Sequence, residues 1–157
     1  MIRLGAVAVA VLAATQAEAL TCARPDPIRS FRDAQAAPES YVVLHGTLGF
    51  DPAAMPGGGF SPTPEPRPAP VGAVFQGFAL GLDGFTRPVE ATVTLQPTCA
   101  GPWCGSLAPG TYLLFAEVTA SGFRVEIGPC GGGAFDGVPE ATLGQLAACL
   151  RGEACAG

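Results

Sequence analysis

Alternation of apolar and polar residues predicts β-strands in several parts of the chain. From Val89 to Leu95 every second residue is apolar, and Phe123–Ile127 repeats this pattern, as expected for strands with one buried face. Further segments are rich in β-branched and aromatic residues and also predict strands: Tyr41–Phe50, Val71–Leu82 and Thr111–Val118. The pattern therefore predicts about five strands and a mostly β fold.

Turn signals indicate how these strands are connected. Asp83-Gly84 predicts a hairpin between the second and third strands, and the segment Thr119–Gly122 predicts another between the fourth and fifth. Because antiparallel hairpins dominate, we expect a closed or partly open, five-stranded antiparallel barrel.

Two short helices are predicted at the ends of the barrel sequence. The first begins at Asp26, an N-cap residue followed by a proline, and ends before Pro38. The second covers Pro139–Leu150, where leucines recur at helical spacing.

Two segments are predicted to lack regular structure. Residues 51–70 contain seven prolines and a glycine triplet, so we expect an exposed loop that joins no strand ladder. Its second half, Pro62–Pro70, suits either a spacer or a polyproline ligand for a partner. The triplet Gly131–Gly133 predicts a flexible joint before the second helix.

Residues 1–19 have the features of a cleaved signal peptide. Arg3 precedes the apolar run Leu4–Ala14, and Ala17-Glu18-Ala19 provides a small-residue cleavage pattern. The run is shorter than the roughly 20 residues that span a bilayer. We therefore expect one domain over residues 20–157, periplasmic or secreted, with no membrane insertion after cleavage.

Composition narrows the class of partner. The chain has a net charge of −5, and all eight of its basic residues are arginine. Nucleic-acid binding needs a clustered basic face, so this balance argues against it and against docking on anionic membranes. It favours a protein or a neutral ligand.

The six cysteines all follow the predicted cleavage site, as in exported proteins with structural disulfides. Spacing favours local bridges Cys99–Cys104 and Cys149–Cys155, which leaves Cys22 to pair with Cys130, although other pairings stay open from sequence alone. A redox or zinc site is the alternative. The sequence has no Cys-x-x-Cys motif for a redox site and no familiar Cys/His ligand set for zinc, so we predict no metal and no cofactor.

Two other residues are candidates for function. His45 is the only histidine, and any hydrolase with a catalytic histidine would have to use it. Its position inside an apolar strand favours a structural role, and the serines show no nucleophile-elbow pattern. Trp103 lies between Pro102 and Cys104, where it either packs beside a disulfide or anchors a partner.

Several motifs resemble the netrin-type family, which includes the tissue inhibitors of metalloproteinases. The N-terminal half carries Cys22-Ala-Arg-Pro-Asp-Pro and Tyr41-Val-Val-Leu-His-Gly-Thr-Leu. The C-terminal half carries Trp103-Cys104-Gly105, Gly110-Thr-Tyr-Leu-Leu-Phe-Ala and Pro129-Cys130. The resemblance covers most of residues 20–157 outside the Pro-rich loop. It implies an OB-fold whose open face lies around the strands Tyr41–Phe50 and Val71–Leu82.

The resemblance also implies a possible inhibitory role for Cys22. In the metalloproteinase inhibitors, the N-terminal cysteine chelates the protease zinc through its free amine and carbonyl. Here Leu20 and Thr21 precede Cys22 after the predicted cleavage, and position 24 is Arg where the family has a second cysteine. We therefore favour a non-enzymatic binding or envelope-associated module. A metalloprotease inhibitor acting through Cys22 and a hydrolase using His45 are the alternatives.

Overall fold

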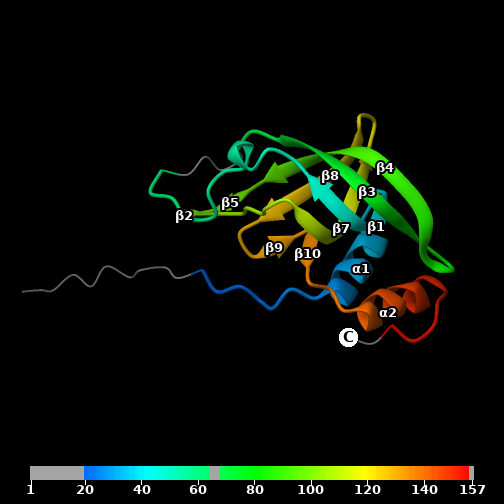
Figure 1. Cartoon of the computed structure of the whole chain (residues 1–157). Helices are drawn as coiled ribbons and strands as arrows, with labels where there is room; N and C mark the ends of the chain where they lie inside the picture. Colours follow the sequence, from blue (N-terminus) through cyan, green and yellow to red (C-terminus); the bar gives the residue numbers. More distant parts are fainter. Residues whose placement is uncertain (1–19, 64–67, 156–157) are drawn as a thin grey trace, which may run out of the picture.

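Five long strands form a closed ring in the computed structural model, which describes residues 20–63 and 68–155 (Figure 1). The predicted signal peptide, residues 1–19, lies outside the described residues. The ring runs β7-β1-β3-β4-β8 and closes where β8 pairs with β7. Its strands are β1 (Tyr41–Gly49), β3 (Val71–Gly81), β4 (Gly84–Pro97), β7 (Gly110–Thr119) and β8 (Gly122–Gly128). The prediction of a mostly β fold is confirmed.

The prediction that all neighbouring strands are antiparallel is wrong at one place. Strand β8 pairs with β4 in a parallel register, Val93 opposite Phe123, whereas the other four contacts of the ring are antiparallel. Strand directions in a closed ring of five cannot alternate throughout, because an odd number of strands leaves two neighbours pointing the same way. One parallel pair is therefore a geometric necessity of this ring.

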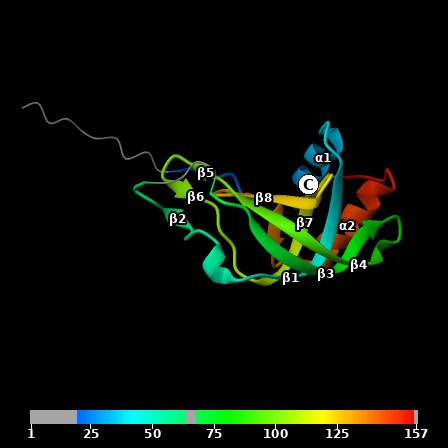
Figure 2. The ribbon, with the colours of Figure 1, turned by 90° about the horizontal axis from the view of Figure 1, so that it is seen from above.

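Five strands of two or three residues add to the ring. They are β2 (Gly59–Phe60), β5 (Cys99–Ala100), β6 (Trp103–Cys104), β9 (Gly131–Gly132) and β10 (Ala134–Asp136). Strands β2, β6 and β5 form a separate small sheet at the opposite end of the molecule from the helices (Figure 2).

The expectation that residues 51–70 join no ladder is therefore wrong at β2, and a short 3-10 helix, η1 (Pro52–Ala54), also lies in this segment. Residues 57–61 contain no proline, so their N–H groups are free to pair.

The glycine triplet at 131–133 is paired backbone, and the prediction of a flexible joint is wrong. Gly131 and Gly132 pair with β8. The N–H of Gly133 donates to the carbonyl of Glu126 at 2.9 Å, and the N–H of Phe115 donates to the carbonyl of Gly133 at 2.7 Å. Gly133 thus bridges β8 and β7 where these two strands have separated.

The helices α1 (Pro27–Ala36) and α2 (Glu140–Leu150) lie next to each other on one side of the ring (Figure 1). The Asp26 carboxylate caps α1, as predicted, by accepting hydrogen bonds from the N–H groups of Ile28 and Arg29. Apolar residues of both helices, among them Phe31 and Leu146, form a second core with the outer side chains of β1 and β7. The main core fills the inside of the ring.

Three disulfides join Cys22 to Cys130, Cys99 to Cys104 and Cys149 to Cys155. These are the partners that cysteine spacing suggests. The first bridge spans 108 residues and ties the N-terminal segment to the turn between β8 and β9. Disulfides persist in oxidising compartments, so the bridges indicate an extracellular or equivalent environment. Among the described residues, no helix is long and apolar enough to cross a membrane.

Candidate functional site

The outer face of β1 and β3 is the first candidate for a binding surface. Register pairs place His45 opposite Phe78 and Thr47 opposite Gln76, with Val74 further along the same face of β3. Their neighbours Leu44, Leu48 and Phe75 point the other way, into the main core. We call the surface formed by His45, Thr47, Val74, Gln76 and Phe78 the β1–β3 face.

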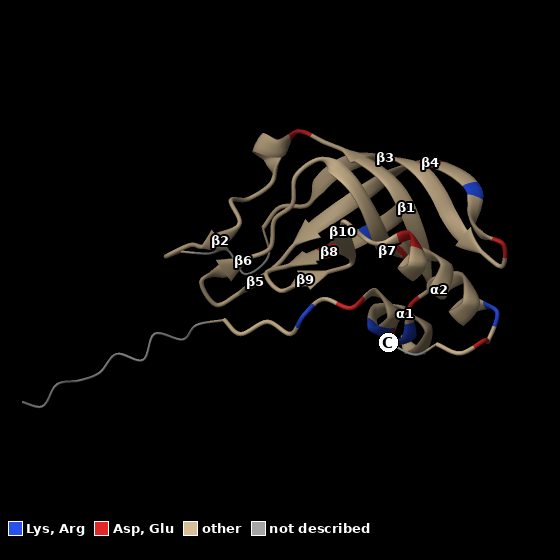
Figure 3. Cartoon of the chain, turned by 60° about the horizontal axis from the view of Figure 1, so that its bottom comes forward, with Lys and Arg blue, Asp and Glu red and all other residues tan. Residues whose placement is uncertain are grey.

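The β1–β3 face is partly apolar and carries no formal charge. Val74 is 52% exposed and Phe78 47% exposed, and neither helix covers them. The segments Tyr41–Gly49 and Val71–Gly81 contain no Asp, Glu, Lys or Arg, which Figure 3 shows as uncoloured ribbon. Solvated faces of antiparallel sheets normally carry polar or charged residues, so the uncovered apolar side chains make this face a candidate contact surface.

The strands of this face approach each other closely at two glycines. Gly46 and Gly77 are direct register partners, and the Phe75 ring lies over them on the core side. A Cβ on Gly46 would overlap the carbonyl oxygen of Gln76, and one on Gly77 would overlap that of His45. Glycine at both positions therefore allows the close approach that sets the shape of the β1–β3 face.

His45 lies at the edge of this face, where its ring meets the Phe85 ring edge-on at 5.7 Å between centroids. Burial lowers the pKa of His45 below its ordinary value. In the part of the chain that the structure describes, its side chain makes no hydrogen bond to a serine or a carboxylate. A histidine-based hydrolase needs a nucleophile within hydrogen-bond reach of the base, and none of the described residues provides one for His45.

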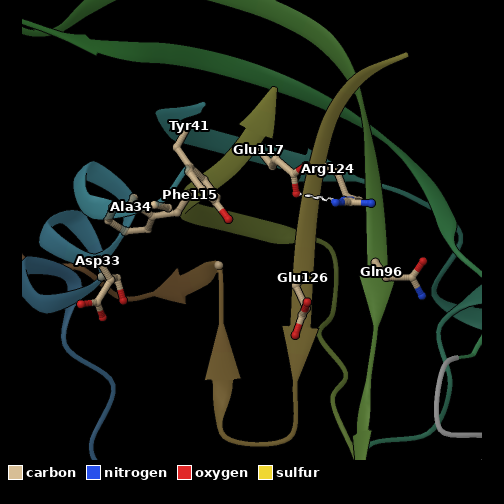
Figure 4. Close-up of a pocket in the computed structure, with 11 residues that line it drawn as sticks. Asp33, Ala34, Tyr41, Gln96, Phe115, Glu117, Arg124 and Glu126 are labelled. Atoms are coloured by element: carbon tan, nitrogen blue, oxygen red, sulfur yellow. Dashed lines mark hydrogen bonds and ion pairs between the residues drawn. The ribbon is translucent and has the colours of Figure 1, made fainter. Parts of the chain in front are cut away.

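A second candidate is a cleft of about 390 Å³ between α1 and the β7–β8 hairpin (Figure 4). Asp33 lines it from α1, and Glu117 and Arg124 line it from the hairpin. Arg124 Nη2 donates to Glu117 Oε2 at 2.6 Å, which joins the two strands across the hairpin. Glu126 extends the acidic wall along β8.

The pKa of Tyr41, which lines this cleft, depends on its burial and on nearby charges. Burial raises the pKa of Tyr41 first, and the negative charges of Glu117 and Glu39 raise it further. Among the described residues, no group of three or more His, Cys, Asp or Glu side chains is arranged to hold a metal ion.

Trp103 lies in β6 beside the Cys99–Cys104 bridge, where it is partly buried. Its ring meets the ring of Phe60, which is 64% exposed, edge-on at 5.7 Å. The indole Nε1 is buried and has no hydrogen-bond partner in the part of the chain that the structure describes. Trp103 thus packs beside a disulfide, as one of the two interpretations expects, and its role as an anchor for a partner stays a prediction.

Cys22 is exposed at the beginning of the described chain and is held by its bridge to Cys130. Its partner Cys130 lies in the turn between β8 and β9, whereas His45 lies in β1 and Trp103 in β6. None of four cavities among the described residues is lined by two of His45, Trp103 and Cys22. Sequence analysis located the strands of the β1–β3 face but did not single out Val74 and Phe78. Their signal is an apolar residue at positions where strand alternation calls for a polar one.

Comparison of this chain with models of protein families, with curated proteins and with solved structures yields no match. The netrin-type resemblance accordingly stays a proposal.

Proposed function

We propose that this protein is an exported, non-enzymatic binding module with an OB-like barrel, and that it holds a protein partner against the β1–β3 face. The observation that carries the proposal is the uncharged β1–β3 face, on which Val74 and Phe78 stay half exposed. The central part of a protein interface is poor in charged residues and rich in aromatic ones, which matches this surface.

The order of the ring strands supports the OB-like part of the proposal. The fourth strand of the ring along the chain, β7, returns to lie beside the first, β1, which is the Greek-key arrangement. The OB-fold is a five-stranded Greek-key barrel that binds ligands on the face of its second and third strands. The second strand of this ring is β3, which carries Val74 and Phe78, and the third is β4, on which the exposed Glu90 lies opposite Gln76.

The shape of the face favours a protein over a small molecule. Four cavities among the described residues have no Val74, Gln76 or Phe78 in their lining. Small ligands are usually enclosed in clefts, whereas an open surface with aromatic anchors suits a partner protein.

Affinity capture from the exported fraction of the native cell tests this proposal. The double variant Val74→Asp/Phe78→Asp introduces two charges into the face. It should lower the amount of captured partner at least tenfold, because unpaired charges at an interface are strongly unfavourable. The matched control is Val118→Asp, which changes an equally exposed valine of β7. A partner retained equally by both variants would contradict the proposed surface.

Inhibition of a zinc metalloprotease through Cys22 is the second candidate function. It is favoured by the exposed Cys22 and by the bridge that fixes it to Cys130. Two forms of the protein, one beginning at Leu20 and one at Cys22, separate the candidates. The inhibitor hypothesis predicts zinc-protease inhibition only by the form with a free Cys22 amine, and absence of inhibition by both forms rejects it.

A further inference from the structure

A small apolar pocket lies between the two helices and the sheet, on the helix side of the ring. Its volume is about 250 Å³. Phe31 and Ala34 line it from α1, Val43 from β1, Leu80 from β3 and Leu150 from the end of α2. Ala34, Leu80 and Leu150 are partly buried and pack against the second core.

The polar residues that line this pocket favour a negatively charged group. Arg87 and Gln35 line it together with Tyr41, and no Asp or Glu does. Among the described residues, the two ion pairs involve Arg124 and Arg151, and none joins Arg87 to a carboxylate. In a protein with net charge −5, an apolar pocket with a lone arginine and no acid is complementary to an anion with an apolar body.

We propose that this pocket binds a short aliphatic carboxylic acid, with the chain against Phe31, Leu80 and Leu150 and the carboxylate at Arg87. Arginine is well suited to carboxylates because its guanidinium offers paired donors. The volume is below the roughly 300–1,000 Å³ of sites for drug-sized ligands, so a single short chain fits. The site does not include Val74 or Phe78 and is independent of the proposed protein partner.

Titration with octanoate, followed by calorimetry and amide NMR, tests this assignment in the disulfide-intact protein. We expect saturable binding with shifts at Leu80 and Leu150. Arg87→Gln should weaken octanoate binding about fivefold, the scale of a solvent-exposed ion pair, and leave octanol binding unchanged. Arg29→Gln, a surface arginine of α1 outside the pocket lining, is the matched control and should have no effect.

A second variant tests where the aliphatic chain of the ligand lies. Ala34→Leu keeps helix propensity and places a larger side chain in the pocket, so it should abolish octanoate binding while the folded state persists by circular dichroism. Equal binding of octanoate and octanol to the native protein, or unchanged binding in Ala34→Leu, would overturn the proposal. Tighter binding of N-acetyl-leucine than of octanoate would also overturn it, because the occupant would then be a peptide C-terminus.

Discussion

Single residues decide the shape of the β1–β3 face. Gly46 and Gly77 bring β1 and β3 close together under the Phe75 ring. His45 stands next to Gly46 in sequence, and its neighbour across the strands is Phe78. A sequence shows that glycines interrupt two apolar strands, but only the register shows that they face each other.

Replacing Gly46 by Ala tests this close approach. The new Cβ would overlap the carbonyl oxygen of Gln76, so we expect a loss of roughly 1–3 kcal/mol in the free energy of unfolding. Gly72→Ala in the same pair of strands is the control, because nothing lies within 4 Å of its Cβ position. Urea unfolding of the two variants should separate them clearly, and equal stabilities would contradict the packing described for Gly46.

The pH dependence of stability should include a contribution from His45. Burial lowers its pKa in the folded chain, so the unfolded chain binds a proton more readily. The contribution of His45 to the free energy of unfolding should therefore be fully present above the ordinary histidine pKa of about 6.5 and be lost as the pH falls below it. The variant His45→Gln should lose less stability than the native protein between pH 7.5 and pH 5.5 in urea unfolding. If the native protein and His45→Gln lost the same free energy of unfolding between the two pH values, folding would not lower the pKa of His45.

At the scale of elements, a local side-chain cap fixes the start of α1, whereas strand pairing fixes the ring. Helix α1 begins where Asp26 accepts hydrogen bonds from two N–H groups, so its start depends on one side chain. Asp26→Ala should cost about 1 kcal/mol of stability, whereas Asp26→Asn should cost little because asparagine also caps well. Thermal unfolding of the two variants checks this, and a neutral Asp26→Ala would mean that packing alone positions α1.

The long elements could be predicted from the sequence because their signals are local. Alternation marks β4 and β8, and a capping residue marks α1. The short strands β2, β5, β6, β9 and β10 could not, because two or three residues carry no periodicity and form strands only where partners lie opposite. Gly131 and Gly132 are typical of a flexible segment until β8 supplies their hydrogen bonds. The candidate site was predicted only as a pair of strands, since exposure of Val74 and Phe78 depends on where the helices pack.

At the scale of the whole molecule, the disulfides differ in how much of the chain they constrain. The Cys22–Cys130 bridge joins cysteines 108 residues apart in sequence, whereas the Cys149–Cys155 bridge joins cysteines 6 residues apart. In the loop-entropy model, removing the long bridge should cost about 4–5 kcal/mol and removing the short one about 2 kcal/mol. Urea unfolding of Cys22→Ala/Cys130→Ala and Cys149→Ala/Cys155→Ala compares them. Equal losses would show that the N-terminal segment contributes little to the constraint.

The central claim, a protein partner on the β1–β3 face, is tested most directly by site-specific photo-crosslinking in the native cell. A photoreactive residue is placed at position 78 and, as a control, at position 118, where the side chain is equally exposed. We predict a discrete crosslinked protein from position 78 that is absent from position 118. Absence of a crosslink at position 78, or the same products from both positions, would contradict the account.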